Sequence, residues 1–222
     1  MSNVAVFGST GLIGSNLLKH LELDTYFSKV YAITRKPIHF ENSKFKNIVI
    51  DFNNINSIEN SLKKCQIVFV SIGTTQSKVN WDHKKYKKID YEIPLNIAKA
   101  SKNLNINKYL IVSSAGADVN AKGFYLSLKG QIENDIIKIG IKNTYIFRPS
   151  LLMGKRKENR TGEKIAQFIM PIFSPLLPKK YRPINAESVA KSMINLSKID
   201  INSVKIYHFE DMILSLRKFK ND

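Results

Sequence analysis

Two groups of polar side chains in the middle of the chain have the types and spacing for acid–base chemistry. Tyr125 and Lys129 are four residues apart, so they share one face of a helix. A phenol has a pKa of about 10, and a nearby ammonium stabilises the phenolate and brings proton transfer toward the neutral range. Ser113 and Ser114 end a predicted strand, and a serine hydroxyl there can orient a substrate oxygen. We expect Ser114 to be this partner, although spacing alone leaves Ser113 open.

Tyrosine and lysine at this spacing also occur by chance on an amphipathic helix with a surface lysine. The residues that open the chain make the catalytic interpretation more specific. Residues 4–7 are apolar and predict a buried parallel strand, followed by glycines in the pattern G-x-x-G-x-x-G at Gly8, Gly11 and Gly14. Glycines let the backbone approach a pyrophosphate, and the N-terminus of the following helix supplies N–H groups. The sequence therefore predicts a dinucleotide cradle; the alternative is a glycine turn that binds nothing.

A pair of cations follows the second predicted strand, where a dinucleotide fold meets the adenosine ribose. An NAD site places a carboxylate here, but this chain has Arg35 and Lys36. Two cations attract a 2′-phosphate through charge-assisted hydrogen bonds. The pair thus predicts NADP(H), against the alternative of two solvated basic residues.

Two further strand ends carry weaker signals. Asp51 closes the third predicted strand, where its carboxylate could accept from the adenine amino group or cap the next turn. Gly73 and Thr74 follow the fourth strand, where they could lie against the cofactor.

The elements that must position these residues alternate along the chain. Strands are predicted over residues 4–7, 29–34, 47–51, 67–72, 109–113, 143–147 and 204–209. Helices are predicted over residues 11–21, 57–64, 91–104, 124–139, 162–173 and 186–198. This alternation predicts an α/β fold, a doubly wound Rossmann-type parallel sheet in a single domain spanning 1–222. Region 151–184, rich in proline and basic residues, is expected to form a small substrate-side lid; an ordinary surface connection is the alternative.

Composition limits the class of protein. The chain has 222 residues and one cysteine, Cys65, which excludes an internal disulfide and led us to expect a cytoplasmic location. No apolar run reaches the length of a membrane span, no signal peptide precedes the first strand, and no metal site is expected. The formal charge is +17, but 29 of the 35 basic residues are lysines spread along the chain. No RNA-binding or recognition-helix signature accompanies them, so nucleic acid is not the expected partner.

Together these motifs resemble the short-chain dehydrogenase/reductase superfamily, in its atypical NAD(P)H-binding branch. The resemblance is nearest to the Tat-interacting-protein-like oxidoreductases and covers most of the chain. Five segments carry it beside the glycine loop: 73–75, 113–117, 124–130, 147–149 and 156–160.

The resemblance implies roles residue by residue. Tyr125 would be the proton donor or acceptor, and Lys129 would hold the nicotinamide ribose. The remaining cofactor contacts that it implies are Thr10, Gly11, Leu12, Ile13, Arg35, Lys36, Gly73, Thr74, Leu152 and Arg160. One position departs from the superfamily: Asp90 stands where a helix asparagine usually helps to build a proton relay.

The sequence therefore predicts an NADPH-dependent oxidoreductase that reduces a carbonyl or similar polarised bond on a small molecule. The alternative is an NADPH-binding redox sensor or regulator with little turnover, because the superfamily branch includes regulatory members. A protein partner or a homodimer is compatible with either hypothesis.

Overall fold

One parallel sheet forms the centre of the protein. The structure, a computed structural model, describes residues 2–154 and 178–219, and within these ranges seven strands join the sheet. They are β1 (Ser2–Phe7), β2 (Phe27–Thr34), β3 (Phe45–Val49), β4 (Ile67–Val70), β5 (Lys108–Val112), β6 (Asn143–Phe147) and β9 (Val204–Tyr207). Their order across the sheet is β3-β2-β1-β4-β5-β6-β9, with every neighbouring pair parallel. This confirms the predicted doubly wound Rossmann-type fold.

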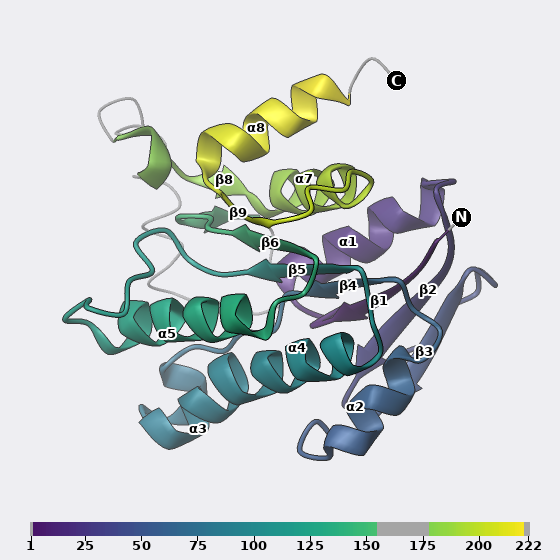
Figure 1. Ribbon diagram of the computed structural model, residues 1–222, viewed down its shortest axis with the longest axis horizontal. Helices are drawn as coiled ribbons and strands as arrows, with labels where there is room; N and C mark the ends of the chain where they lie inside the picture. The colour runs from purple at the N-terminus through teal and green to yellow at the C-terminus, as the bar shows by residue number, and fades with distance from the viewer. Residues whose placement is uncertain (1, 155–177, 220–222) are drawn as a thin grey trace.

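Helices cover both faces of the sheet (Figure 1). One face carries α1 (Leu12–Leu23), α7 (Ala186–Ser197) and α8 (Phe209–Lys218), and the other carries α2 (Ile55–Leu62), α4 (Ile93–Asn103) and α5 (Phe124–Ile139). Each face of the sheet has its own hydrophobic core, and side chains alternate between them along β1. Val4 and Val6 pack with the α1, α7 and α8 side, and Ala5 and Phe7 pack with the α2, α4 and α5 side. Burial on both faces is the reason that these strands are continuously apolar.

The functional edge of the sheet lies where β1 and β4 end side by side. The chain first builds outward from β1 through β2 to β3, then crosses back to place β4 on the other side of β1. Ser71 still donates its N–H to the carbonyl of Phe7 at 3.0 Å, beyond the end of β4. Ligands of open α/β sheets bind outside the carboxyl ends of the strands at such a reversal.

The end of the chain differs from the prediction. The strand predicted to reach residue 209 stops at Tyr207, and α8, which sequence reasoning missed, begins at Phe209. The N–H of His208 donates to the Asp211 carboxylate at 2.9 Å, which caps the helix start. The apolar alternation of β9 runs into this cap without a glycine or proline, so periodicity gave no sign of the boundary.

The segment before α4 also differs. The helix predicted from residue 91 begins at Ile93, with Pro94 in its first turn. Ahead of it lie the short helix α3 (His83–Lys87) and a π-helical turn (Lys88–Glu92). The helix predicted over 162–173 lies outside the described residues.

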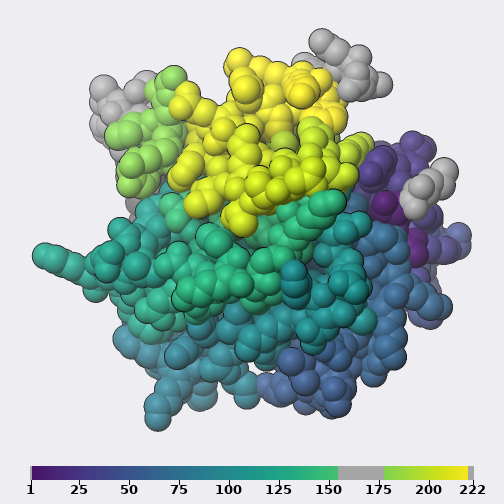
Figure 2. All heavy atoms as spheres, viewed as in Figure 1, coloured from purple at the N-terminus to yellow at the C-terminus, as the bar shows by residue number. Residues whose placement is uncertain are grey.

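Segments far apart in sequence pack closely. A second sheet pairs β7 (Leu152–Met153) with β8 (Ile184–Asn185). Figure 2 shows the end of the chain, in yellow, packed directly on the middle of the chain, in teal. Across residues 2–154 and 178–219, no helix combines the length and apolar character needed to cross a bilayer.

Candidate functional site

The glycine loop between β1 and α1 forms a tight cradle at the functional edge. Gly8 has a φ of +79°, and a Cβ there would lie 2.6 Å from the carbonyl carbon of Ser71. A Cβ on Gly14 would lie 2.1 Å from the carbonyl oxygen of Gly8, so this glycine lets α1 pack directly on the loop. Gly11 donates its N–H to the same carbonyl at 2.9 Å. The three glycines therefore set the path of the backbone as the spacing predicted.

Helix α1 begins without a side-chain cap. Gly11 is its N-cap residue, and its first turn contains no acidic side chain. The first amides of a helix have no intrahelical acceptor, and the positive end of the helix dipole favours an anion. Thr10 and Gly11 are exposed beside these amides, and Leu12 is half-buried. Ile13 is buried in the core, so its side chain is not available to a ligand.

Arg35 and Lys36 lie immediately after β2 and both side chains are exposed. Hydrogen bonds from side chains of β2 and β3 hold their turn in place. The Thr34 hydroxyl donates to the Lys36 carbonyl at 2.8 Å, and the Asn47 amide donates to the Thr34 hydroxyl at 2.7 Å. The two cations therefore stand on an ordered turn at the end of the strand adjacent to β1.

Asp51 lies two residues beyond the end of β3 and acts as a turn residue. Its carboxylate accepts from the Asn53 backbone N–H at 2.9 Å and from the Asn53 side chain at 2.8 Å. The exposed side chain thus performs the turn-capping role that was the alternative to an adenine contact.

Asp90 joins the loop after β4 to α5. One carboxylate oxygen accepts the Thr74 N–H at 2.8 Å, and the other lies 3.0 Å from the Lys129 ammonium. A Cβ on Gly73 would approach that second oxygen to 3.4 Å, so the small residue lets the loop pass close to Asp90. Asp90 belongs to the π-helical turn, a type of distortion that often occurs at functional sites.

Lys129 is held as a buried cation. Its side chain is 6% exposed and that of Asp90 is 2% exposed. Burial is the largest single influence and would lower the pKa of the Lys129 ammonium. The attraction and hydrogen bond of the Asp90 carboxylate, together with the charges of Tyr125 and Glu133, outweigh burial and raise the pKa above its ordinary value. Lys129 therefore stays protonated at neutral pH.

Tyr125 lies one helical turn before Lys129 on α5. The Lys129 nitrogen is 5.9 Å from the centroid of the Tyr125 ring. The ring also packs edge-on against Tyr86 of α3, with 6.3 Å between centroids, and the Tyr86 hydroxyl donates to the Thr74 carbonyl at 3.3 Å. The tyrosine and lysine thus share one face, as predicted, and that face lies beside the loop after β4.

The two serines have different partners. Ser113 is buried, and its hydroxyl donates a hydrogen bond to the carboxylate of Glu133. Glu133 in turn accepts from the Arg148 guanidinium at 3.0 and 3.1 Å. Ser114 is half-buried, and its hydroxyl makes one long contact, 3.3 Å, with the adjacent Ala115 carbonyl. Ser113 is therefore committed to an internal network, and Ser114 is the more available hydroxyl.

The loop that carries Ser114 lies against the start of α5. The Asp118 N–H donates to the Leu126 carbonyl at 3.2 Å. A Cβ on Gly130 would lie 2.3 Å from both the Asp118 carbonyl carbon and the Val119 nitrogen, so the loop backbone touches the helix at this glycine. This contact fixes Ser114 and Tyr125 on adjoining segments.

The described part of region 151–184 also reaches this edge. A Cβ on Gly154 would lie 3.1 Å from the side chain of Leu12, which places the end of β7, with Leu152, beside the glycine loop. Tyr181 approaches the position of a Cβ on Gly116 to 4.0 Å. Both flanks of the predicted lid therefore border the site. Arg160 and the rest of 155–177 lie outside the described residues.

Three features of this edge fit a dinucleotide. A glycine cradle leads into an uncapped helix N-terminus, two cations stand at the end of β2, and a buried ammonium lies one turn from a tyrosine. Among the described residues, no group of three histidine, cysteine or acidic side chains could hold a metal ion.

Sequence reasoning missed the partners that hold α5. Asp90 was noted only as a departure from the family pattern, and the Glu133–Arg148 pair was not predicted. Tyr125, Lys129 and Glu133 recur every four residues, a spacing that places all three on one face of α5 and could have marked Glu133 as part of the same edge.

Comparison with known proteins supports a nicotinamide dinucleotide as the cofactor class and does not distinguish NADP from NAD. A family model described as NAD(P)H-binding matches residues 8–196. Protein FMP52, mitochondrial, from Candida albicans is 32% identical over 203 residues, which cover 89% of this chain and 88% of the relative. The Saccharomyces cerevisiae protein of the same name is 34% identical over 207 residues, covering 88% and 87%. Because these relatives are named as mitochondrial proteins, they contradict the cytoplasmic expectation, which rested only on the low cysteine content and the absence of a signal peptide.

Solved structures with the same fold are more distant in sequence. ADP-L-glycero-D-manno-heptose-6-epimerase from Helicobacter pylori aligns with a TM-score of 0.71 at 17% identity, covering all of this chain and 83% of that one. MoeE5 in complex with UDP-glucose and NAD aligns with a TM-score of 0.69 at 13% identity, covering 98% and 82%. These likenesses support the fold alone. A closer tie to the Tat-interacting-protein-like oxidoreductases stays a prediction from the motifs.

The matched family spans the glycine loop, the Asp90 turn and α5, which are the segments that converge at the carboxyl edge of the sheet. The chain belongs to the NAD(P)H-binding family that this model describes.

Proposed function

We propose that this protein is an NADPH-dependent reductase of a carbonyl or similarly polarised bond on a small molecule. The observation that carries the proposal is the buried Asp90, which joins the Lys129 ammonium to the loop after β4. Through this contact the catalytic face of α5 and the cofactor edge of the sheet form one unit.

The preference for NADPH rests on the end of β2. Arg35 and Lys36 stand on an ordered turn, and Asn47 rather than a carboxylate supports that turn. Two exposed cations can form charge-assisted hydrogen bonds with a 2′-phosphate, whereas residues 35–40, which follow β2, include no acid to accept from a 2′-hydroxyl. Gly73, Thr74 and Leu152 would line the cofactor farther along the edge.

Tyr125 would act as the general acid. A nicotinamide held at this edge would supply a hydride to the carbonyl carbon and be oxidised in doing so. Tyr125 would donate its phenol proton to the carbonyl oxygen, so that the product is an alcohol. Lys129 would hold the nicotinamide ribose and stabilise the phenolate, and Ser114 would donate a hydrogen bond to the substrate oxygen.

Cofactor titration tests the first part of this proposal. The fluorescence of NADPH and of NADH is followed as each is titrated with the protein, and NADPH should bind at least about tenfold more tightly, as expected for one or two charge-assisted hydrogen bonds. Equal affinities would remove the role assigned to Arg35 and Lys36.

A panel of aldehydes and ketones tests the chemistry. NADPH oxidation is measured with the wild type and with Tyr125→Phe, which keeps the ring and removes the proton. We expect kcat to fall by about a hundredfold or more, the usual range for loss of a general acid. Undiminished turnover in Tyr125→Phe would rule out this residue as the acid.

A second candidate function is an NADPH-binding sensor with little turnover. The Asp90 carboxylate partly compensates the Lys129 charge and so weakens the stabilisation that this lysine gives a Tyr125 phenolate. Tight NADPH binding with no oxidation across the panel would favour the sensor, and a partner recovered by pull-down should then respond to NADPH.

The names of the relatives carry a proposal on location. We infer that the protein acts at or in mitochondria, and fractionation of cells that express the tagged chain tests this: it should follow mitochondrial markers.

A further inference from the structure

We propose that the protein docks on an anionic lipid bilayer through a basic surface that surrounds Trp81. This surface, the Trp81 patch, consists of Trp81, Lys78, Lys84, Lys85, Lys87 and Lys88. The inference is independent of the enzymatic proposal.

Trp81 is presented to solvent. Its side chain is 68% exposed, although tryptophan usually buries most of its large apolar surface. Asn80 and Trp81 both have a positive φ, +52° and +60°, a conformation that a bulky side chain rarely adopts. The backbone at Asn80 and Trp81 therefore holds an energetically unfavourable conformation, and the indole of Trp81 is exposed to solvent. Tryptophan is enriched where one end of a side chain meets lipid and the other meets water.

Helix α3 turns its lysines away from the protein. Tyr86 is its buried residue and packs against Phe124 and Tyr125 of α5. His83 stacks on Phe124 with 3.8 Å between ring centroids. With that face fixed, Lys84, Lys85, Lys87 and Lys88 are all exposed.

The patch carries a net positive charge. Residues 77–89 contain five lysines and a single acid, Asp82. The Asp82 carboxylate accepts the backbone N–H groups of Lys84 and Lys85 at 2.9 and 3.1 Å, as the N-cap of α3. Each lysine near an anionic bilayer contributes a favourable electrostatic free energy of binding, and the contributions of several lysines add up.

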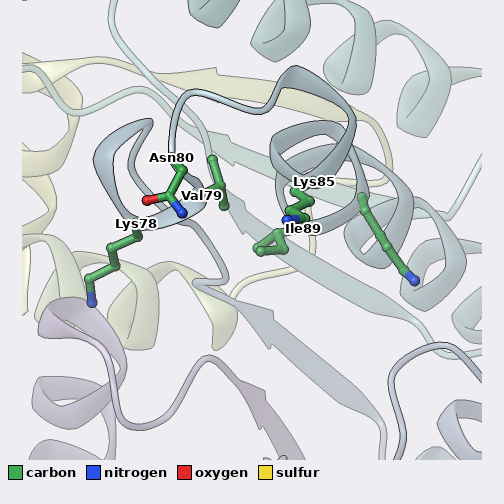
Figure 3. Close-up of a pocket in the computed structure, with 6 residues that line it drawn as sticks. Lys78, Val79, Asn80, Lys85 and Ile89 are labelled. Carbon is green, nitrogen blue, oxygen red and sulfur yellow. The ribbon is translucent and has the colours of Figure 1, made fainter.

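A shallow hollow separates Lys78 from α3 (Figure 3). It has a volume of about 200 Å³ and is lined by Lys78, Val79, Asn80, Lys85, Lys88 and Ile89. Figure 3 shows Lys78 on one side of it and Lys85 with Ile89 on the other. Aliphatic side chains at its base with ammonium groups around it suit the boundary between headgroups and acyl chains, where lysine stems lie on apolar material and their charges stay in water.

The composition of the patch favours a bilayer over nucleic acid. Single-stranded nucleic acid is bound by successive stacking aromatics. Of the tryptophan and tyrosine in residues 77–89 only Trp81 is exposed, and the ring of His83 is already stacked on Phe124. The cations of this segment are all lysines, which act as point charges, and none is arginine, whose fork matches individual phosphates and bases. A diffuse anionic surface is the partner that this chemistry fits.

The patch borders the candidate active site. Tyr86, which anchors α3, donates its hydroxyl to the Thr74 carbonyl beside Asp90. A bilayer held at the patch would lie next to the carboxyl edge of the sheet.

The chain contains a single tryptophan, so its intrinsic fluorescence reports this residue alone. Full-length protein is mixed with vesicles of phosphatidylcholine and phosphatidylserine, or of phosphatidylcholine alone. We expect the emission to shift to the blue and to be quenched by brominated acyl chains only with the anionic vesicles. An unchanged spectrum with anionic vesicles would overturn the proposal.

Charge variants separate the patch from the general positive charge of the protein. Lys84→Gln, Lys85→Gln, Lys87→Gln and Lys88→Gln are combined, and sedimentation with anionic vesicles should weaken by at least about tenfold. The matched control replaces Lys46, Lys63, Lys64 and Lys142, which are also exposed, and should change binding much less. Equal losses in the two variants would contradict a specific patch. Urea unfolding midpoints establish that each variant is folded.

Two other outcomes would also refute docking on lipid. Fluorescence that responds to single-stranded oligonucleotides but not to vesicles would assign the patch to nucleic acid. A concentration-dependent change without vesicles, matched by a dimer in ultracentrifugation, would assign it to a second copy of the chain. NADPH titration of the same samples is a separate readout, so neither result bears on the enzymatic proposal.

Discussion

The Lys129 ammonium lies 3.0 Å from the Asp90 carboxylate, and both side chains are almost completely buried. The other carboxylate oxygen of Asp90 accepts the Thr74 N–H at 2.8 Å. The lysine beside Tyr125 is therefore not an isolated cation; it is half of an ion pair anchored to the loop after β4. Any change at Asp90 therefore acts on both α5 and the loop after β4.

Asp90→Asn is expected to destabilise the fold strongly. The substitution leaves a buried ammonium without its counter-charge, which typically costs about 3 kcal/mol or more in the free energy of unfolding. Urea denaturation measures the loss. The matched control is Lys138→Gln, which breaks an exposed pair with Asp135 and should cost under about 1 kcal/mol. Similar losses in both variants would mean that the buried pair contributes little.

The same pair predicts a pH dependence. Because the pKa of Lys129 is raised on folding, its ionisation stabilises the protein fully below the unfolded pKa and loses that effect as pH rises through the folded pKa. The free energy of unfolding of the wild type minus that of Lys129→Met should stay constant from about pH 7 to 9 and decrease above about 10.5. A difference that increases over the alkaline range would show that the sign of the pKa shift is wrong.

Arg35 and Lys36 are expected to select the cofactor. Replacing both with serine should weaken NADPH binding by about tenfold for each charge-assisted hydrogen bond lost and leave NADH binding nearly unchanged. Fluorescence titration with both cofactors measures this selectivity. Serine at Lys63 and Lys64, which removes the same charge elsewhere on the surface, is the control. If the control loses NADPH affinity equally, net charge and not a local contact is responsible.

Gly130→Ala is expected to disturb the loop that carries Ser114. The new methyl group would lie 2.3 Å from backbone atoms of Asp118 and Val119, so the loop must move, at a cost of about 1–3 kcal/mol in stability. Gly123→Ala is the comparison, because nothing lies within 4 Å of its Cβ and its φ is −83°. Thermal unfolding should separate the two variants clearly. Comparable Tm values would mean that the loop adjusts without strain.

Much of this architecture could be predicted because its signals are local. Strand–glycine–helix order at Gly8, the four-residue spacing of Tyr125 and Lys129, and the cations after β2 each occupy a short segment whose geometry follows from backbone periodicity. The alternation of apolar strands with helices then predicts a parallel sheet covered by helices on both faces. Such patterns place the carboxyl ends of the strands together without knowledge of any long-range contact.

The boundaries that failed lacked a local marker. At His208 the cap of α8 is formed by Asp211, three residues ahead, and no glycine or proline separates it from β9. The π-helical turn that directs Asp90 inward is invisible in hydrophobic periodicity, because one extra residue in a turn changes the face and not the composition.

The sequence by itself therefore determined the kind of fold and the types of side chain available at its functional edge. Only the tertiary structure decided which of these side chains pair with one another in hydrogen bonds and ion pairs. Ser113 and its partner Glu133 are twenty residues apart in the sequence. Thr74 and its partner Asp90 are sixteen residues apart. Buried polar groups must find partners once water is excluded, and only the packed chain shows which partners lie within reach.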